Sequence, residues 1–261
     1  MAVLVKKFGG SSVATPEKIY RLVDRVLREK TPEDKIVIVV SAMGDTTDDL
    51  LTLAGRISAH LPKREMDMLL ATGEQVSIAL LASAFMERGQ KAVSFTGPQA
   101  GIRTNSQHTK AGILEVKAER VQKALDEGNI VIVAGFQGAT EDGDITTLGR
   151  GGSDTTAVAI AAGLQADICE IYTDVDGVYT ADPRIVPEAR KLKEITFSEM
   201  LELARLGAGV MQPRAVEYGE HNGVDIHVRS TFSQEPGTII RREYTVEEKE
   251  FVIRGVTSDI N

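Results

Sequence analysis

Short runs of β-branched residues alternate along the chain with longer amphipathic stretches. The predicted strands are Val3–Phe8, Lys35–Val40, Lys91–Phe95, Ile130–Ala134, Ile168–Thr173 and Asp225–Arg229. The predicted helices are Pro16–Glu29, Thr47–Ile57, Glu65–Arg88, Glu115–Glu127, Ser153–Gly163, Phe197–Leu206 and Pro213–Asn222. Several strands are apolar at successive positions, which is typical of parallel strands covered by helices on both faces. The pattern predicts an α/β fold, a three-layer α/β/α sandwich with a central, mostly parallel sheet.

Turn and cap residues support this organisation. Thr15 precedes Pro16 at a first-turn position, which is a common way for a helix to begin. The polar stretch 138–147 predicts a hairpin that turns at Asp142 and Gly143.

Composition narrows the class of protein. Apolar residues make up 42% and charged residues 26% of the 261 residues, which is typical of a globular rather than a disordered chain. With 30 basic and 38 acidic residues the net charge is −8, so we do not expect a nucleic-acid binder. The longest apolar run is the six residues 157–162, whereas a membrane span needs roughly 20. Since the N-terminus also lacks a signal-peptide pattern, we expect a cytoplasmic protein with no membrane segment.

Cys169, in a strand-like setting, is more typical of a buried structural thiol than of a nucleophile.

The first candidate site is the loop between the first strand and the first helix, Lys6–Ser12. Its glycines let the backbone approach a ligand and direct N–H groups at an anion. The hydroxyl of Ser11 and the charge of Lys7 add groups that bind phosphate oxygens. Because the lysine precedes the glycines, the loop is not a Walker motif. An ordinary tight turn explains a Gly-Gly pair as well, so this loop alone leaves both interpretations open.

The second candidate site is the glycine-rich stretch Thr147–Thr156, which carries Arg150 into the start of a helix. A helix N-terminus favours bound anions, and a guanidinium matches the geometry of a carboxylate or phosphate. The alternative is an ordinary helix start in which Asp154 offsets the helix dipole. Two such loops in one α/β chain favour phosphate binding.

The third candidate site follows a strand directly, at Tyr172–Arg184. Acidic, hydroxyl and aromatic groups at the carboxyl end of a strand suit a nucleotide. Asp-Gly and Asp-Pro are also common turn dipeptides. The segments Ser41–Thr47 and Ala71–Gln75 could supply small-molecule contacts, although turn and capping roles explain their patterns equally well.

Five segments occur together in the order typical of one family. They are Lys-Phe-Gly-Gly-Ser-Ser (7–12), Val-Ser-Ala-Met-Gly-Asp-Thr-Thr (40–47), Thr-Gly-Glu-Gln (72–75), Thr-Leu-Gly-Arg-Gly-Gly-Ser-Asp-Thr-Thr-Ala (147–157) and Tyr-Thr-Asp-Val-Asp-Gly-Val-Tyr-Thr-Ala-Asp-Pro-Arg (172–184). From residue 3 to about residue 240 the chain resembles the catalytic domain of the aspartate kinases (aspartokinases), in the amino-acid kinase superfamily. The resemblance implies phosphorylation of the L-aspartate β-carboxylate to 4-phospho-L-aspartate, the first step of lysine, threonine and methionine biosynthesis. It implies ATP and Mg²⁺ as cofactors.

The resemblance also implies a role for each motif. Lys7 is expected to contact the transferred phosphate, and Asp154 to organise the cationic centre around it. Arg150 is expected to bind the aspartate α-carboxylate, and Glu74 to lie near the amino group. The implied catalytic residues are Lys7, Asp154 and Arg150. The implied ATP-binding residues are Lys7, Phe8, Gly9, Gly10, Ser11, Thr173, Asp174, Tyr179, Thr180, Ala181, Asp182, Pro183 and Arg184. The implied aspartate-binding residues are Ser41, Thr47, Glu74, Arg150, Gly151 and Ser153, and no metal ligand is expected.

Two positions depart from the family pattern. Ser11 stands where the first loop usually has Thr, which keeps the hydroxyl. Gly209 stands where many relatives have a lysine that contacts ATP, so that contact is missing here. After Arg241 the sequence becomes strongly charged, and the run Phe251–Val256 resembles the first strand of the ACT regulatory domains. We therefore expect a kinase domain at residues 1–242, and at 243–261 a linker with the first strand of a missing ACT-type region.

The resemblance implies a reaction governed by charge. The acceptor carboxylate has an ordinary pKa near 3.9, so it is ionised at neutral pH and needs no general base. Catalysis then requires neutralisation and in-line positioning of two anions. The four histidines have no metal-like or triad-like spacing and are expected to be surface or packing residues: His60, His108, His221 and His227.

Two alternatives remain. One is another acceptor used on the same scaffold, such as acetylglutamate, glutamate, carbamate or uridylate. The other is a domain that binds nucleotide or a partner without turnover. The expected ligands are L-aspartate and ATP, and a homodimer is compatible with the sequence.

Overall fold

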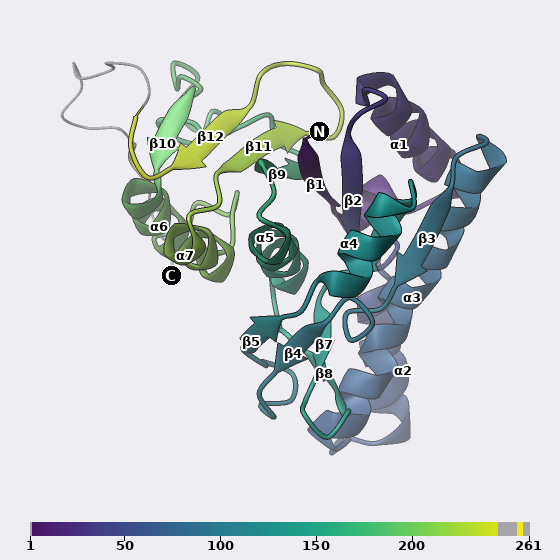
Figure 1. The fold of residues 1–261 in the computed structure, drawn as a ribbon. Helices are drawn as coiled ribbons and strands as arrows, with labels where there is room; N and C mark the ends of the chain where they lie inside the picture. Colours follow the sequence, from purple (N-terminus) through teal and green to yellow (C-terminus); the bar gives the residue numbers. More distant parts are fainter. Residues whose placement is uncertain (1, 245–254, 258–261) are drawn as a thin grey trace.

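A computed structural model describes residues 2–244 and 255–257. Its centre is an eight-stranded sheet in the order β10-β12-β11-β9-β1-β2-β6-β3 (Figure 1). The strands are β1 (Val3–Phe8), β2 (Lys35–Val40), β3 (Ala92–Phe95), β6 (Ile130–Ala134), β9 (Ile168–Thr173), β10 (Glu194–Thr196), β11 (Ile226–Ser230) and β12 (Thr238–Arg241). Neighbouring strands run parallel except for the antiparallel pair β11–β12. The prediction of a central, mostly parallel sheet is confirmed.

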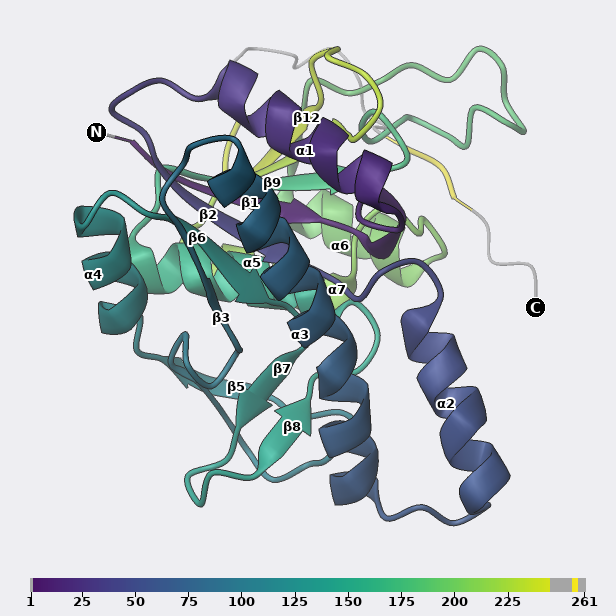
Figure 2. The same ribbon diagram turned by 90° about the vertical axis from the view of Figure 1, so that its right-hand side faces the viewer.

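Helices cover both faces of this sheet, as predicted. One layer holds α4 (Glu119–Asp126), α5 (Gly152–Leu164), α6 (Phe197–Arg205) and α7 (Pro213–Asn222). The other layer holds α1 (Pro16–Glu29) and α3 (Lys63–Glu87), and α2 (Thr46–Ile57) packs against α3. Figure 2 shows α1 and α3 side by side on the face that Figure 1 places at the right. A short 3₁₀ turn, η1 (Gly10–Ser12), follows β1.

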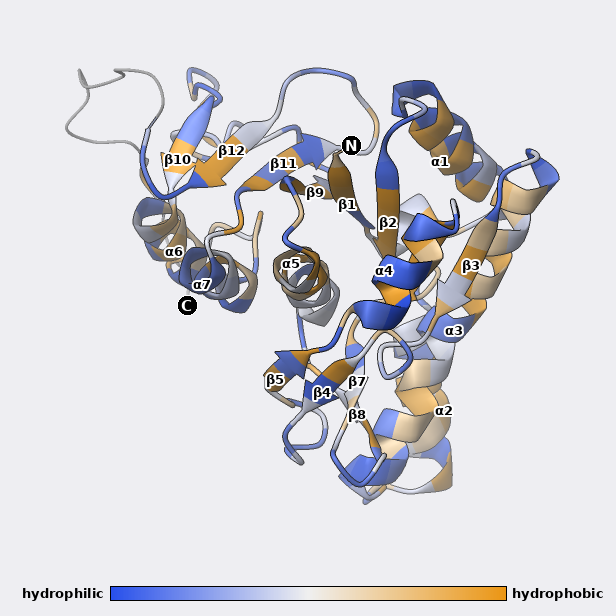
Figure 3. Ribbon diagram, viewed as in Figure 1, coloured by the Kyte–Doolittle hydropathy of each residue, from blue (hydrophilic) through white to orange (hydrophobic). Residues whose placement is uncertain are grey.

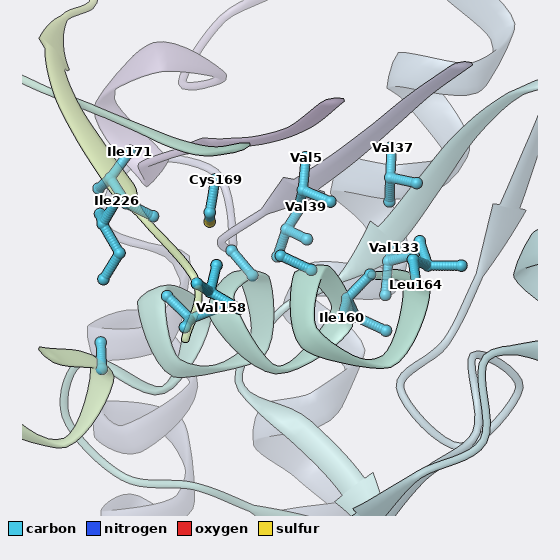
Figure 4. Close-up of a cluster of buried hydrophobic side chains, with 14 of the residues drawn as sticks. Val5, Val37, Val39, Val133, Val158, Ile160, Leu164, Cys169, Ile171 and Ile226 are labelled. Carbon is cyan, nitrogen blue, oxygen red and sulfur yellow. The ribbon is translucent and has the colours of Figure 1, made fainter. Parts of the chain in front are cut away.

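Alternation along β1 divides its side chains between the two layers. Val5 belongs to the apolar cluster that packs against α5, whereas Phe8 belongs to the cluster under α1 and α3. Figure 4 shows Val5, Val39 and Cys169 directed from the sheet toward Val158 on α5. Since successive strand residues point to opposite faces, Lys7 shares the α5 face with Val5. The apolar colouring of β1, β2 and α5 in Figure 3 matches this burial.

A second, four-stranded sheet lies below the first in Figure 1, in the order β5-β4-β7-β8. It comprises β4 (Ile102–Thr104), β5 (Ile113–Val116), β7 (Gln137–Ala139) and β8 (Ile145–Thr147). The predicted hairpin is confirmed, because β7 and β8 pair antiparallel around Gly143, whose φ is +85°. The predicted helix start at Glu115 is wrong. The segment 113–116 pairs with β4, and the helix begins at Glu119.

The structure can be compared with three further predictions, on membrane segments, on Cys169 and on the last strand. The helix α3 is long and apolar enough to span a membrane by composition, but 56% of its apolar window is buried in the protein, as in a core helix. Cys169 is fully buried, and burial raises the pKa of its thiol, which confirms a structural rather than nucleophilic residue. The predicted strand at Phe251–Val256 falls mostly outside the described residues.

Candidate active site

The candidate site lies where the parallel strands end. The carboxyl ends of β1, β2, β6 and β9 meet at one edge of the sheet, and each of the predicted loops after β1, β2 and β9 begins there. Figure 2 shows this edge on its right-hand side. The N-terminus of α5 reaches the same edge through contacts of its first residues with β1 and with the loop after β2.

An ion pair joins the first loop to the second. Lys7 Nζ lies 2.7 Å from Asp154 Oδ1, and the two side chains are only 13% and 12% exposed. Lys7 is the last α5-facing residue of β1, and Asp154 lies in the first turn of α5. The two predicted glycine-rich loops therefore converge, as the sequence interpretation required.

Close backbone approach explains a glycine in the first loop. A Cβ on Gly10 would lie 2.5 Å from the carbonyl oxygen of Ala42. The N–H of Gly44 also donates to the carbonyl of Gly10 over 3.1 Å. The first loop thus rests on the loop after β2, and no side chain fits between them.

Two predicted aspartate-binding residues hydrogen-bond to each other. Ser41 Oγ donates to Ser153 Oγ over 3.0 Å, which links the end of β2 to the start of α5. A Cβ on Gly135, just after β6, would lie 2.6 Å from Ser153 Oγ. Two sheet-edge segments, after β2 and after β6, therefore lie against Ser153.

Glu74 is buried with an incomplete set of partners. It lies on α3 and is 2% exposed. Its Oε1 accepts the N–H of Ala42 over 3.1 Å, whereas its Oε2 has no hydrogen-bond partner among the residues that the structure describes. Burial raises the pKa of this carboxyl to about 7. A buried carboxylate oxygen without a donor is suited to receive a cationic ligand.

The loop that carries Arg150 has a defined shape. Gly149 and Gly151 both have positive φ, +78° and +68°, and a Cβ on Gly151 would lie 1.8 Å from Gln212 Cγ. Arg214 donates to the carbonyls of Leu148 (2.7 Å) and Ala111 (2.8 Å). The Arg150 side chain is exposed and forms no ion pair within the described residues. It is available to an anion.

A buried acidic residue that the sequence interpretation missed supports this loop. Asp67 on α3 is fully buried, and its Oδ1 accepts from Thr147 Oγ1 (2.5 Å) and from the N–H of Thr109 (3.0 Å). His108 Nδ1 lies 2.8 Å from Asp67 Oδ2, so this histidine is a packing residue with a polar partner. Asp67 lies two helical turns before Glu74 on the apolar face of α3, and a carboxylate in that stripe is the signal that could have found it.

The predicted nucleotide residues of the third segment lie at the end of β9 and beyond it. Thr173 Oγ1 donates to Asp174 Oδ1 over 3.0 Å at the strand end. Tyr179 OH donates to Asp176 Oδ1, and Arg184 pairs with Asp182 on an exposed loop. Thr180, Ala181 and Pro183 belong to the same loop.

Other predicted residues are less closely joined to the site. The ring of Phe8 is buried and stacks on Tyr172 at 4.4 Å, so only the main chain of Phe8 faces the edge. Ser11 is exposed, and Thr47 lies in the first turn of α2. No hydrogen bond of the described residues joins either side chain to the rest of the site. A Cβ on Gly209 would meet no atom of residues 2–244 and 255–257 within 4 Å.

No metal-ligand cluster is present among residues 2–244 and 255–257, where no three His, Cys, Asp or Glu side chains converge. The acidic residue nearest the cationic centre, Asp154, is already paired with Lys7.

Comparisons with known proteins identify the family and agree with the fold. The profile of the Amino acid kinase family matches residues 2–230. The chain is 58% identical to the Aspartokinase of Bacillus sp. (strain MGA3) over 98% of this chain and 62% of that one. The aspartate kinase structure from Synechocystis shares 51% identity and a TM-score of 0.82, covering 93% of this chain and 40% of the other. Aspartokinase III of E. coli, solved with aspartate and ADP, shares 28% identity and a TM-score of 0.82, over 94% and 65% of the two chains. This chain spans about three fifths of the curated relatives it matches.

Proposed function

Because the chain belongs to the amino acid kinase family, we propose that it transfers the terminal phosphate of ATP to the β-carboxylate of L-aspartate. The product would be 4-phospho-L-aspartate, an acyl phosphate that enters the biosynthesis of lysine, threonine and methionine. The relatives named Aspartokinase, at 53–58% identity, support this choice of acceptor. We place the reaction in the cytoplasm.

The observation that carries the proposal is the unpartnered oxygen of Glu74. An amino acid acceptor brings an ammonium group, and a buried carboxylate oxygen without a donor fits that group. Glu74 also holds the loop after β2 through the N–H of Ala42, which places it beside Ser41. An acceptor without an amino group would leave this oxygen unpaired.

The neighbouring groups fit the rest of aspartate. Arg150, exposed on the loop before α5, would bind the α-carboxylate with its planar guanidinium. Ser41 and Ser153, already hydrogen-bonded to each other, would orient the bound amino acid from the ends of β2 and α5. Gly151 and Thr47 would border the same pocket.

Charge neutralisation is the main task of the site. The acceptor carboxylate is ionised at neutral pH and must approach a polyanion. Lys7 would hold the transferred phosphate, and Asp154 would fix the direction of its ammonium group. The N-terminal end of the α5 dipole adds a positive field. Together these groups would let two anions meet in line without a general base.

The nucleotide would occupy the remaining part of the edge. Gly9, Gly10 and Ser11 would line its phosphates, and Thr173, Asp174 and the segment 179–184 would surround its ribose and base. Mg²⁺ would enter with ATP as the MgATP substrate. The ion then shields phosphate charge.

A hydroxylamine trap tests the proposal. Incubation of the 261-residue chain with aspartate and MgATP should yield aspartyl hydroxamate, because hydroxylamine captures acyl phosphates. Reactions without ATP, or with glutamate or acetylglutamate in place of aspartate, are the controls. Nucleotide binding without any hydroxamate would instead identify a non-catalytic domain. Hydroxamate formed from another acid in preference to aspartate would reassign the acceptor.

A further inference from the structure

A buried charged cluster lies between the sheet and α1, on the face opposite Lys7. Lys6 is 3% exposed, and its ammonium contacts Glu170 and, at 3.5 Å, Glu29. Arg229 Nη1 lies 2.9 Å from Glu170 Oε1. Arg25, 8% exposed, lies with its guanidinium 4.7 Å from the centre of the Tyr172 ring. None of these charges takes part in the proposed phosphate and aspartate contacts.

Arg25 directs its donors at the main chain. Its Nη1 donates to the carbonyls of Ser230 (2.8 Å) and Thr231 (2.7 Å), and its Nη2 donates to the carbonyl of Ser233 (3.1 Å). Its Nε donates to Glu29 Oε1 over 3.0 Å. One guanidinium on α1 therefore fixes three carbonyls of the turn 230–233, which begins at the last residue of β11. Figure 2 shows this segment passing beside α1.

The turn 230–233 also forms hydrogen bonds with two segments of the predicted nucleotide site. The N–H of Thr231 donates to the carbonyl of Thr173 over 2.8 Å, at the end of β9. Thr231 Oγ1 also lies 3.2 Å from Ser12 Oγ, in the 3₁₀ turn of the first glycine loop. A continuous series of contacts thus runs from Arg25 through Thr231 to both sides of the predicted nucleotide site.

Glu29 keeps the guanidinium in place. Burial by itself would raise the pKa of Glu29, but the charges of Lys6 and then of Arg25 lower it below its ordinary value. The carboxylate is therefore ionised at neutral pH and anchors Arg25 from the next turn of α1. A planar, anchored guanidinium holds several carbonyls at fixed angles, which a lysine ammonium at the same position cannot do.

We propose that Arg25 is a positioning residue for the nucleotide half of the site, acting through the turn 230–233 on Thr173 and Ser12. The proposal rests on the proposed function for its assignment of the nucleotide half. Arg25 is not among the residues proposed to contact either substrate, and its hydrogen bonds reach only the turn beside the nucleotide half. Its removal should therefore weaken ATP binding and leave aspartate binding nearly unchanged.

Arg214, on the other side of the sheet, offers a position for a contrasting substitution. It also donates to two main-chain carbonyls, those of Leu148 and Ala111, but these belong to the loops around Arg150. Its loss should affect aspartate rather than ATP. Arg28, exposed on α1, is a matched control for the helix itself.

The test compares Arg25→Lys, Arg25→Ala, Arg214→Lys and Arg28→Ala by steady-state kinetics with each substrate varied. We expect Arg25→Lys to raise KM for MgATP about tenfold, the scale of a lost charged hydrogen bond, with KM for aspartate within about twofold. Arg214→Lys should show the reverse pattern, and Arg28→Ala should match the parent chain. Equal increases in both KM values after Arg25→Lys, or no increase in either, would overturn the proposal. So would an Arg25→Lys protein that unfolds below the assay temperature, since Arg25 would then be a purely structural residue.

A second measurement separates this inference from the proposed function. Titration calorimetry with MgADP needs no turnover and should show about tenfold weaker binding in Arg25→Lys. Hydrogen exchange at the Thr231 amide should become faster, because its bond to Thr173 depends on the turn. A chain that makes no acyl phosphate but shows both changes would refute the kinase activity and keep the role of Arg25. Unchanged MgADP affinity of Arg25→Lys in a chain that makes acyl phosphate would refute the role of Arg25 and keep the kinase activity.

Discussion

Lys7 Nζ and Asp154 Oδ1, from segments nearly 150 residues apart in the sequence, lie 2.7 Å apart at the edge of the sheet. The pair joins the end of β1 to the first turn of α5. Because both side chains are almost buried, solvent screens their attraction less than it would at the surface. The geometry of the cationic centre therefore depends on both residues.

Replacing Lys7 by alanine should reduce kcat at least about a hundredfold, the scale of losing one preorganised charge contact to a transition state. Circular dichroism should show an intact fold. Lys123→Ala, on the exposed face of α4, serves as the control for loss of one positive charge. A kcat near that of the parent chain would remove Lys7 from the proposed mechanism.

Replacing Arg150 by alanine should raise KM for aspartate about tenfold or more, because a bidentate contact with the α-carboxylate is lost. KM for ATP should change much less. Since Arg150 is exposed and makes no ion pair within the described residues, stability should be unaffected. Arg56→Ala, exposed on α2, is the control, and an unchanged KM for aspartate would reassign Arg150.

The pKa of Glu74, raised by burial to about 7 from an ordinary 4.5, should make stability depend on pH. The folded protein holds the proton up to about pH 7, whereas the unfolded chain releases it near 4.5. The contribution of Glu74 to the free energy of unfolding is therefore complete below about pH 4.5 and is lost as pH rises through 7. The total loss is about 3 kcal/mol. Thermal melts of Glu74→Gln should lack this decline, whereas Glu87→Gln, exposed on the same helix, should keep it. Parallel curves for Glu74→Gln and the parent chain would contradict the raised pKa.

The same titration should control aspartate binding, because an ammonium group requires the ionised form of Glu74. About a tenth of Glu74 is ionised at pH 6, so KM for aspartate should be about tenfold higher at pH 6 than at pH 8. Initial rates measured across this range at saturating MgATP test the expectation. Glu74→Gln should abolish the dependence as well as weaken binding. A flat KM for the parent chain between these two pH values would separate Glu74 from the ammonium group.

Replacing Gly151 by alanine should destabilise the chain and impair the Arg150 loop. Its positive φ costs an L-residue about 1 kcal/mol, and the new Cβ would overlap the side chain of Gln212. Gly143→Ala is a matched control, because Gly143 also has positive φ, +85°, but open space around it. We expect a lower Tm and a higher KM for aspartate for Gly151→Ala than for Gly143→Ala. Equal effects of the two variants would show that only backbone strain matters.

Periodicity was sufficient for the long elements and missed several short strands. The strands β1, β2, β6 and β9 and the helices α1 and α7 occur at the predicted positions, because long apolar runs and caps specify them locally. Strands of three or four residues, such as β4, β10 and β12, carry too few positions to show a period. From its sequence alone, the segment 113–116 was predicted to lead into a helix. It becomes a strand because β4 lies beside it.

The motifs likewise indicated the candidate residues but not their partners. Glu74 could be named from its motif, whereas its buried environment and its unpartnered oxygen depend on the loop after β2 that covers it. Arg25 and Arg214 were missed because each donates to main-chain carbonyls far away in the sequence. Because every residue carries a main-chain carbonyl, the sequence does not indicate which carbonyl such a side chain binds.

The sequence by itself determined which residue types follow which strands, and therefore that glycine-rich loops, a lysine and an arginine would gather at one edge of a parallel sheet. It also determined that Lys6 and Lys7 face opposite sides, since strand residues alternate. Only the tertiary structure decided what each side contains. Lys7 meets Asp154 at the start of α5, and Lys6 meets Glu170 and Glu29 beneath α1, because the packing of two helical layers fixes where distant charges find their partners.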